Sequence, residues 1–408
     1  MDYLKMHLLL GLVVITFSFC AESCQKGENH GQLTPGSYNL PPEDSSTTNK
    51  TDTSHHDNTS PEPLDPTKMS FEVVFSNTAD DAKATVAELK YNKNGWVSLE
   101  FDDNSLDALK AEELLKGKFY TDGCGNNVPY AAALAVIGRS NYNNQEMGTM
   151  GDYYVTYAQM KTMIGLGWDI ENHSLYHEPT GNYNNGTDWA KNISEMNALI
   201  LQKINYNMNG AVVPVNYSGF PTAAKNFGYL FSSSESTFDN LAPGLGDYQK
   251  VASFNLAPLT FSAFNRIFND DWSKMETDVK SATATLITRK NSYFRLGSHK
   301  VNINNLQNIL DNFSSVTKDN ILFLSTREIM EYRVMAKLPI TYKTEANILK
   351  VVIDPKTLPD RFRWRDLSFI VTSKAKITNI KNLNGIDKAT FNPETGLVNI
   401  FKQKTIWQ

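Results

Sequence analysis

Residues 168–177 are the most informative part of the chain and read Trp168-Asp169-Ile170-Glu171-Asn172-His173-Ser174-Leu175-Tyr176-His177. A short apolar run and a glycine precede them, and two histidines stand four residues apart at their end. On a helix, residues at this spacing share one face, so two imidazoles can bind a single metal ion. The stretch therefore predicts part of a metal site, to which another segment must add a ligand.

Residues 96–104 offer that ligand. They alternate in the way typical of a β-strand, and the pattern ends in the adjacent carboxylates of Asp102 and Asp103. Because successive side chains of an extended backbone diverge, one carboxylate can bind metal while the other remains free as a base. We expect the two segments to form one site.

Together these motifs resemble the polysaccharide deacetylases of the NodB type, also grouped as carbohydrate esterase family four. The first family motif, a strand ending in Phe-Asp-Asp, matches Phe101-Asp102-Asp103, and the second matches residues 167–177. The resemblance continues through a second buried strand at 128–138, Gly228-Tyr229 after a short helix, and Leu296-Gly297-Ser298-His299. It covers residues 70–335, and the order of the motifs makes it specific.

The resemblance implies a role for each site residue. Asp103, His173 and His177 would bind one divalent metal ion, with zinc preferred over cobalt, nickel or iron. Asp102 would act as the general base on metal-bound water, and His299 would protonate the departing sugar nitrogen. Residues implied to contact substrate are Pro221 in the third motif and Trp272 in the fourth.

The chain departs from the family at its third motif. An arginine normally orients the catalytic aspartate there, whereas the matching stretch, residues 218–222, has Gly219 at that position. Either Arg266 or Arg295 substitutes from elsewhere in the fold, or Asp102 is less well held and activity is altered. In addition, Glu100 takes a place usually occupied by threonine, and the fourth motif is displaced to residues 269–272, which suggests an insertion between residues 232 and 260.

The order of the expected elements indicates the α/β class. Residues 69–336 alternate strands, expected at 71–75, 96–101, 131–137, 211–215, 293–296 and 321–324, with helices that include 156–166, 188–204 and 325–335. This order favours a parallel sheet, and the resemblance implies that the sheet closes into a distorted (β/α) barrel. The catalytic groups would then lie at the carboxyl ends of the strands.

Residues 337–408 have a different pattern, with short alternating strands separated by turns that contain Pro, Asn and Gly. We expect a small all-β, sandwich-like domain there. It either packs on the barrel as a structural domain or binds carbohydrate. Trp364 and Trp407 could stack on a sugar or lie in the core.

The N-terminal region predicts export. Lys5 and His7 precede an apolar run at 8–19, so residues 1–24 are interpreted as a signal peptide, either of the lipoprotein type, as in exported lipoproteins of Bacteroides, or a plain secretory signal. Cys20 or Cys24 would carry the lipid and anchor the protein to a membrane. Residues 25–68 are polar and low in complexity, so we expect a disordered tether. These features predict an outer-membrane or cell-surface lipoprotein, or a periplasmic protein.

Composition is consistent with a glycan-processing enzyme. The 408 residues are 41% hydrophobic, enough for a sizeable core, and the formal net charge of −5, without a long basic run, argues against nucleic acid as a partner. We therefore predict a metal-dependent hydrolase that removes acetyl groups from an N-acetylated polysaccharide or glycan. The alternatives are an O-acetyl polysaccharide esterase and a catalytically weakened glycan-binding protein.

Overall fold

The computed structural model describes residues 65, 67–178, 188–235, 252–253, 261–404 and 407. Glu62–Gln408 forms one compact unit. The predicted signal peptide and nearly all of the predicted tether lie outside the described residues. In the described part of the chain, no helix combines the length and the apolar composition needed to cross a membrane.

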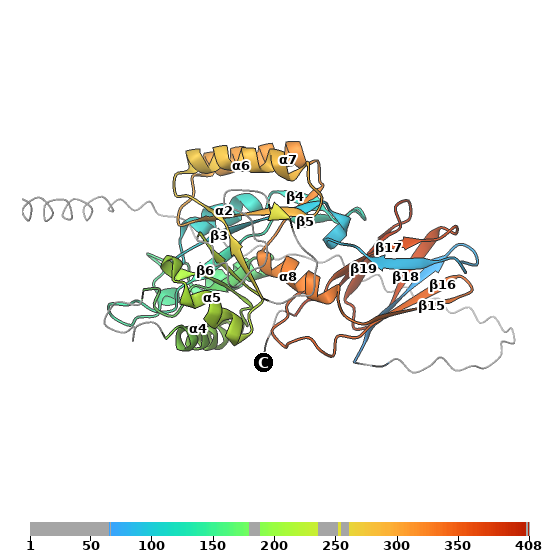
Figure 1. Cartoon of the computed structure of the whole chain (residues 1–408), viewed down its shortest axis with the longest axis horizontal. Helices are drawn as coiled ribbons and strands as arrows, with labels where there is room; N and C mark the ends of the chain where they lie inside the picture. Colours follow the sequence, from blue (N-terminus) through green and yellow to red (C-terminus); the bar gives the residue numbers. More distant parts are fainter. Residues whose placement is uncertain are drawn as a thin grey trace, which may run out of the picture. The chain divides into compact units, whose positions relative to one another are not determined.

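The central feature is a parallel sheet that is nearly closed into a barrel (Figure 1). Each strand pairs with the next in the order β3 (Gly95–Phe101), β6 (Ala133–Val136), β7 (Asp169–Asn172), β8 (Gly210–Val212), β9 (Phe231–Ser234) and β11 (Ser262–Asn265). The last strand, β13 (Ser292–Ser298), returns to pair parallel with β3. The predicted α/β barrel class is confirmed.

Closure depends on one short segment of chain. β11 pairs with β9, and β12 (Ile267–Phe268) pairs with β13, so that Arg266 alone separates the two strands. Two further strands extend the sheet: β14 (Ile321–Phe323) lies parallel to β3, and β10 (Ala252–Ser253) lies antiparallel to β13. The segment around Arg266 therefore bridges the two sides of the barrel.

Helices alternate with the strands, as expected. They are α2 (Asp107–Leu115), α3 (Tyr157–Gly165), α4 (Trp189–Ile204), α5 (Gly219–Phe227), α6 (Trp272–Leu286), α7 (Ile303–Thr317) and α8 (Thr326–Met335), and α6 and α7 lie side by side (Figure 1). Local chemistry sets their starts: Thr156 and Gln159 form a capping box on α3, and the Ser325 hydroxyl accepts the backbone N–H of Glu328 on α8. The three helices predicted over 156–166, 188–204 and 325–335 are confirmed.

Short elements fill the connections. These are the 3₁₀ turns η1 (Lys90–Asn92), η2 (Met147–Thr149) and η3 (Pro214–Asn216), and the hairpin β4 (Phe119–Thr121) with β5 (Asn127–Pro129). Two predicted strands are shorter than expected. The 128–138 stretch contains the end of β5 and then the separate strand β6, and 211–215 leaves the sheet after Val212, because Pro214 opens a 3₁₀ turn.

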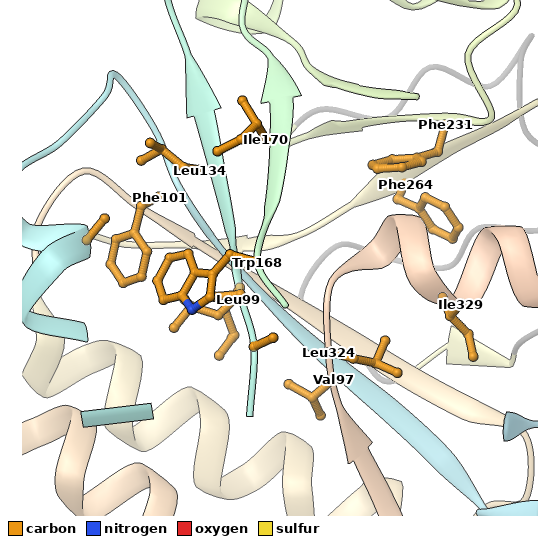
Figure 2. Packing of buried hydrophobic residues seen from close by; sticks show 14 of the residues in the cluster. Val97, Leu99, Phe101, Leu134, Trp168, Ile170, Phe231, Phe264, Leu324 and Ile329 are labelled. Carbon is orange, nitrogen blue, oxygen red and sulfur yellow. The ribbon is translucent and has the colours of Figure 1, made fainter. Parts of the chain in front are cut away.

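The alternation of β3 divides its side chains between two environments. Val97, Leu99 and Phe101 pack into the apolar core, where the Phe101 ring stacks on Trp168 with 6.1 Å between ring centroids (Figure 2). Ser98, Glu100 and Asp102 point to the opposite face, which is the barrel interior. Burial of the apolar face fixes the register of β3 and so places its polar residues inside.

Two four-stranded antiparallel sheets make the β domain. One contains β15 (Ile340–Glu345), β16 (Ile348–Ile353), β1 (Met69–Phe75) and β18 (Ile377–Asn384); the other contains β19 (Lys388–Asn392), β20 (Leu397–Phe401), β17 (Leu367–Thr372) and β2 (Lys83–Val86). Their inner faces share a core in which the rings of Phe71 and Phe369 are 5.3 Å apart. The prediction that the barrel begins at residue 69 is wrong, since β1 and β2 pair with strands that lie more than 250 residues later in the chain.

Polar contacts join the β domain to the amino ends of the barrel strands. Arg363, 2% exposed, donates hydrogen bonds of 2.6 Å to the carbonyls of Ile164 and Trp168, directly before β7. The Glu331 carboxylate accepts the backbone N–H groups of Arg363 and Trp364. Trp364 and Trp407 are buried, which confirms the core interpretation over sugar stacking.

We expect Arg363→Ala to lower the free energy of unfolding by about 3 kcal/mol, because two hydrogen bonds of a buried charged group to the carbonyls of Ile164 and Trp168 are lost. Urea unfolding of the full chain, followed by circular dichroism and tryptophan fluorescence, measures the change. Lys356→Ala, at an exposed position, is the matched control. Separate transitions for barrel and β domain, with the barrel unaffected by Arg363→Ala, would contradict this coupling.

Candidate active site

The three predicted metal ligands lie together at the carboxyl ends of β3 and β7. The Nε2 atom of His173 is 3.3 Å from Oδ1 of Asp103, and Nε2 of His177 is 3.5 Å from the same oxygen. The three ligand atoms all lie within 4.8 Å of one another. Ligand bonds of about 2.0–2.1 Å in a tetrahedral site place neighbouring ligand atoms about 3.3 Å apart, so the spacing suits one small divalent cation.

A left-handed turn, not a helix, brings the two histidines together. β7 ends at Asn172, and Ser174 and His177 have φ values of 68° and 59°. The Asn172 side chain accepts the N–H of Ser174, and the Ser174 hydroxyl accepts the N–H of His177. The prediction of a helical pair is therefore wrong, because these side chains bond to nearby backbone and favour a turn. Asp103 likewise follows its strand with φ of 62°.

Hydrogen bonding and charge suit the cluster for a cation. The Nδ1 atom of His173 lies 2.9 Å from the carbonyl of Val212; donation there leaves Nε2 as the ligand atom facing Asp103. Burial, and then the neighbouring His173, lower the pKa of His177 to about 4, which keeps its imidazole neutral. Oδ1 of Asp103 is buried without a hydrogen-bond partner, an orphan that a cation would satisfy. The residues present therefore fit a divalent metal, whose identity these ligand types do not decide.

The predicted base, Asp102, is held by an arginine from the other side of the barrel. Arg266, between β11 and β12, donates from Nη1 to Oδ1 at 2.8 Å and from Nη2 to Oδ2 at 2.5 Å. Such bidentate pairing fixes both the position and the rotation of a carboxylate. Arg266 is thus the candidate that contacts Asp102. At Gly219 an added Cβ would lie 3.1 Å from the Trp189 ring, so that position has little room for a side chain.

Three neighbours fix Arg266 in turn. Nη1 also donates to Glu100 at 3.2 Å, and the guanidinium lies 4.9 Å from the centre of the Phe268 ring. A Cβ added to Gly297 would lie 2.7–2.8 Å from the Arg266 side chain, so glycine is what leaves room for it. The role of Gly297 was missed, although it stands inside the late histidine motif.

The second arginine candidate, Arg295, contacts Glu100 and not Asp102. Arg295 pairs with the other oxygen of Glu100 and donates from Nε to the Thr326 hydroxyl at 2.9 Å. Glu171 is buried in the same interior, where burial and the charge of Glu100 raise its pKa well above the usual range. Around Glu100, the carboxylates of Glu100 and Asp102 pair with the guanidiniums of Arg266 and Arg295.

His299 is held by a carboxylate that was not predicted as a site residue. Asp270 lies 3.0 Å from Nδ1 of His299 and also accepts the backbone N–H of that residue at 2.8 Å. This leaves Nε2 facing the cluster, 3.5 Å from Oδ2 of Asp103. Partial burial raises the pKa of Asp270, but the hydrogen bonds from His299 and Ser298 outweigh it and lower the pKa. The acidic run at 269–272 was the signal for Asp270.

The two predicted substrate contacts are not supported. Pro221 is buried in the first turn of α5. Trp272 is 4% exposed, and its indole N–H donates to the carbonyl of Lys300 at 2.8 Å. Both side chains are used in packing, so their burial argues against direct contact with substrate.

No protein-family model and no curated protein matches the sequence. Solved structures do resemble the fold. A family 4 acetyl xylan esterase of Clostridium thermocellum, in complex with a cobalt ion, is 17% identical, with 57% of this chain and 89% of that chain covered and a TM-score of 0.32. A polysaccharide deacetylase of Bacillus cereus is 13% identical, with 57% and 91% covered and a TM-score of 0.33.

A third similar structure is that of a pseudoenzyme. It is a CE4 family pseudoenzyme of Bacillus anthracis, 10% identical, with 58% of this chain and 66% of that chain covered and a TM-score of 0.36. At these identities and scores, likeness does not assign an activity or a substrate to this chain.

We expect the protein to bind one Zn²⁺ per chain, and Asp103→Asn and His177→Ala each to weaken binding by more than about 100-fold, since each removes one of three ligands. Isothermal titration of metal-stripped protein measures this. Asp270→Asn, which changes a neighbouring carboxylate outside the ligand set, should retain the ion. Undiminished binding by His177→Ala would refute the ligand set.

We expect Arg266→Met to lower the free energy of unfolding by about 3–5 kcal/mol, because Asp102 and Glu100 lose a buried cationic partner. Gly297→Ala should act in the same direction by displacing the Arg266 side chain. Chemical denaturation measures both, with Lys274→Met at an exposed position as control. Equal stability of Arg266→Met and the control would show that the pair contributes nothing.

Proposed function

We propose that this protein is a metal-dependent hydrolase that removes acetyl groups from an N-acetylated polysaccharide. One observation carries the proposal. It is the combination of the Asp103, His173 and His177 cluster with the Asp102 carboxylate bound by Arg266 and the His299 imidazole bound by Asp270. A base and an acid together with a cation site form the set that hydrolysis of an unreactive acyl bond requires.

The residues would divide the reaction between them. When bound, a divalent ion at the three ligands would supply Lewis-acid activation of water and of the acyl carbonyl. Asp102, fixed by Arg266, would accept the proton of the attacking water. His299, with Nδ1–H directed at Asp270, would deliver a proton from Nε2 to the departing nitrogen. Protonation of the leaving group matters most for amides, since an amine anion is a very poor leaving group.

The roles of His299 and Asp102 distinguish the deacetylase from two alternatives, an O-acetyl esterase and a glycan-binding protein. An O-acetyl esterase would use the same water attack but depend less on His299, because an alkoxide leaves more easily than an amide anion. A weakened glycan-binding protein would have lost the support of its base. The bidentate contact of Arg266 with Asp102 favours an active enzyme over that second alternative.

We further propose that the enzyme works outside the cytoplasm, anchored through Cys20 or Cys24. This rests on the sequence of the apolar run at 8–19 and the polar stretch at 25–68. Such a tether would hold the barrel away from a membrane and within reach of an extended glycan.

We expect the metal-loaded chain to release acetate from an N-acetylated glycan, and Asp102→Asn to lower kcat at least about 1000-fold while one metal ion per chain is retained, because the amide cannot accept the proton. A panel of N-acetylated and O-acetylated oligosaccharides, with metal-stripped protein reloaded with zinc or cobalt, measures this. Glu195→Gln, at an exposed position, is the control.

The outcomes distinguish the deacetylase from the esterase and from the glycan-binding protein. Release from esters alone would replace the amide proposal by the esterase. Stoichiometric metal without release from any substrate would overturn the enzyme proposal and favour glycan binding.

A further inference from the structure

The β6–α3 loop, residues 137–156, lies against both segments that carry the metal-ligand candidates. The Val155 N–H donates to the carbonyl of Asn104 at 2.8 Å, and Tyr154 forms an antiparallel bridge with Ser105, just after Asp103 in the chain. Elsewhere in the loop, the Asn144 side chain accepts the hydroxyl of Tyr176, the residue before His177. The loop therefore forms part of the rim of the candidate active site.

Two neighbouring tyrosines stand on this rim. Tyr153 is 69% exposed, a large fraction for an aromatic side chain on an ordered turn, and its ring centre is 6.4 Å from that of Tyr154 at an interplanar angle of 49°. Tyr154 is half-buried. Burial, and then the charge of Asp103, raise the pKa of the Tyr154 hydroxyl.

The backbone under the two rings is fixed before any ligand arrives. The carbonyl of Met150 accepts the N–H groups of both Tyr153 and Tyr154 at 3.0 Å. Asn104, to which the turn is attached, is completely buried, and its side chain bonds to both the N–H and the carbonyl of Ile137. Binding on such a turn orders little additional chain, so contact energy is not lost to conformational entropy.

The chemistry of the rings selects a class of ligand. The C–H face of a pyranose ring is apolar and packs on an aromatic face, whereas its edge carries hydroxyls that hydrogen-bond with a phenol. Tyrosine supplies rigid contact area together with a polar tip. Because the two rings are tilted, they cannot both stack on one sugar face; Tyr153 suits the face and Tyr154 the edge.

We propose that Tyr153 and Tyr154 form a subsite for the sugar residue next to the acetylated one, with the Tyr153 ring as its platform. The inference rests on the proposed function and adds to it the residues that would hold a second pyranose unit of the substrate. A single acetylated sugar, or a small acetyl ester, would reach the metal centre without occupying the subsite.

The test compares substrates of different length on the metal-loaded full chain. Tyr153→Ala is expected to raise KM for acetylated oligosaccharides about tenfold, the loss of about 1.4 kcal/mol of stacking, with kcat within about twofold. Turnover of 4-nitrophenyl acetate should be unchanged. Tyr153→Phe should retain the KM of the parent, and Tyr342→Ala, at another exposed tyrosine on β15, is the matched control.

An unchanged KM in Tyr153→Ala for every oligosaccharide turned over would overturn the subsite and leave the enzyme proposal intact. Should no substrate be turned over, calorimetry measures whether the chain binds two kinds of oligosaccharide. These are β-1,4-linked N-acetylglucosamine oligomers and acetylated xylose oligomers. Binding that Tyr153→Ala weakens would support the subsite without the deacetylase, and absence of binding by the parent chain would overturn both.

Discussion

The bidentate ion pair between Asp102 and Arg266 is the interaction on which the rest of the site depends. Both side chains are buried, and a charge in the barrel interior is tolerated only when a partner of opposite sign is held in good geometry. Glu100 and Arg295 complete the balance below them. Arg266 also stands where the chain passes from β11 to β12, so the group that neutralises the base lies at the point where the barrel closes.

Residues 266–270 connect the two predicted proton-transfer groups. Arg266 clamps Asp102, and Asp270 orients His299. Between them, the Phe268 ring contacts the guanidinium and also meets the imidazole edge-to-face at 5.0 Å. One short segment thus sets the positions of base and acid relative to each other.

The two ends of the barrel have different roles. Arg363 and Glu331 fill the amino ends with contacts to the β domain, and the carboxyl ends remain for chemistry.

Much of the fold and site could be predicted because the signals are local. A strand pattern ending in Asp102 and Asp103 and helices with an apolar face are both set within a few residues. The same locality explains the errors. The spacing of His173 and His177 suits a helix, but the side chains of Asn172 and Ser174 accept hydrogen bonds from the nearby backbone and select a turn. Trp272, which the resemblance implied as a substrate contact, is buried, and its indole N–H donates to the carbonyl of Lys300.

By itself, the sequence determined the alternation of strands and helices, the strand ends that carry the predicted ligands, and the residue types available for them. Only the tertiary structure decided which arginine serves Asp102, since Arg266 lies 164 residues away and nothing periodic links the two. It also decided that β1 and β2 belong with strands near the end of the chain. The physical reason is common to both: local preferences act along the backbone, whereas pairing across the barrel depends on which groups burial brings together and whether their charges balance.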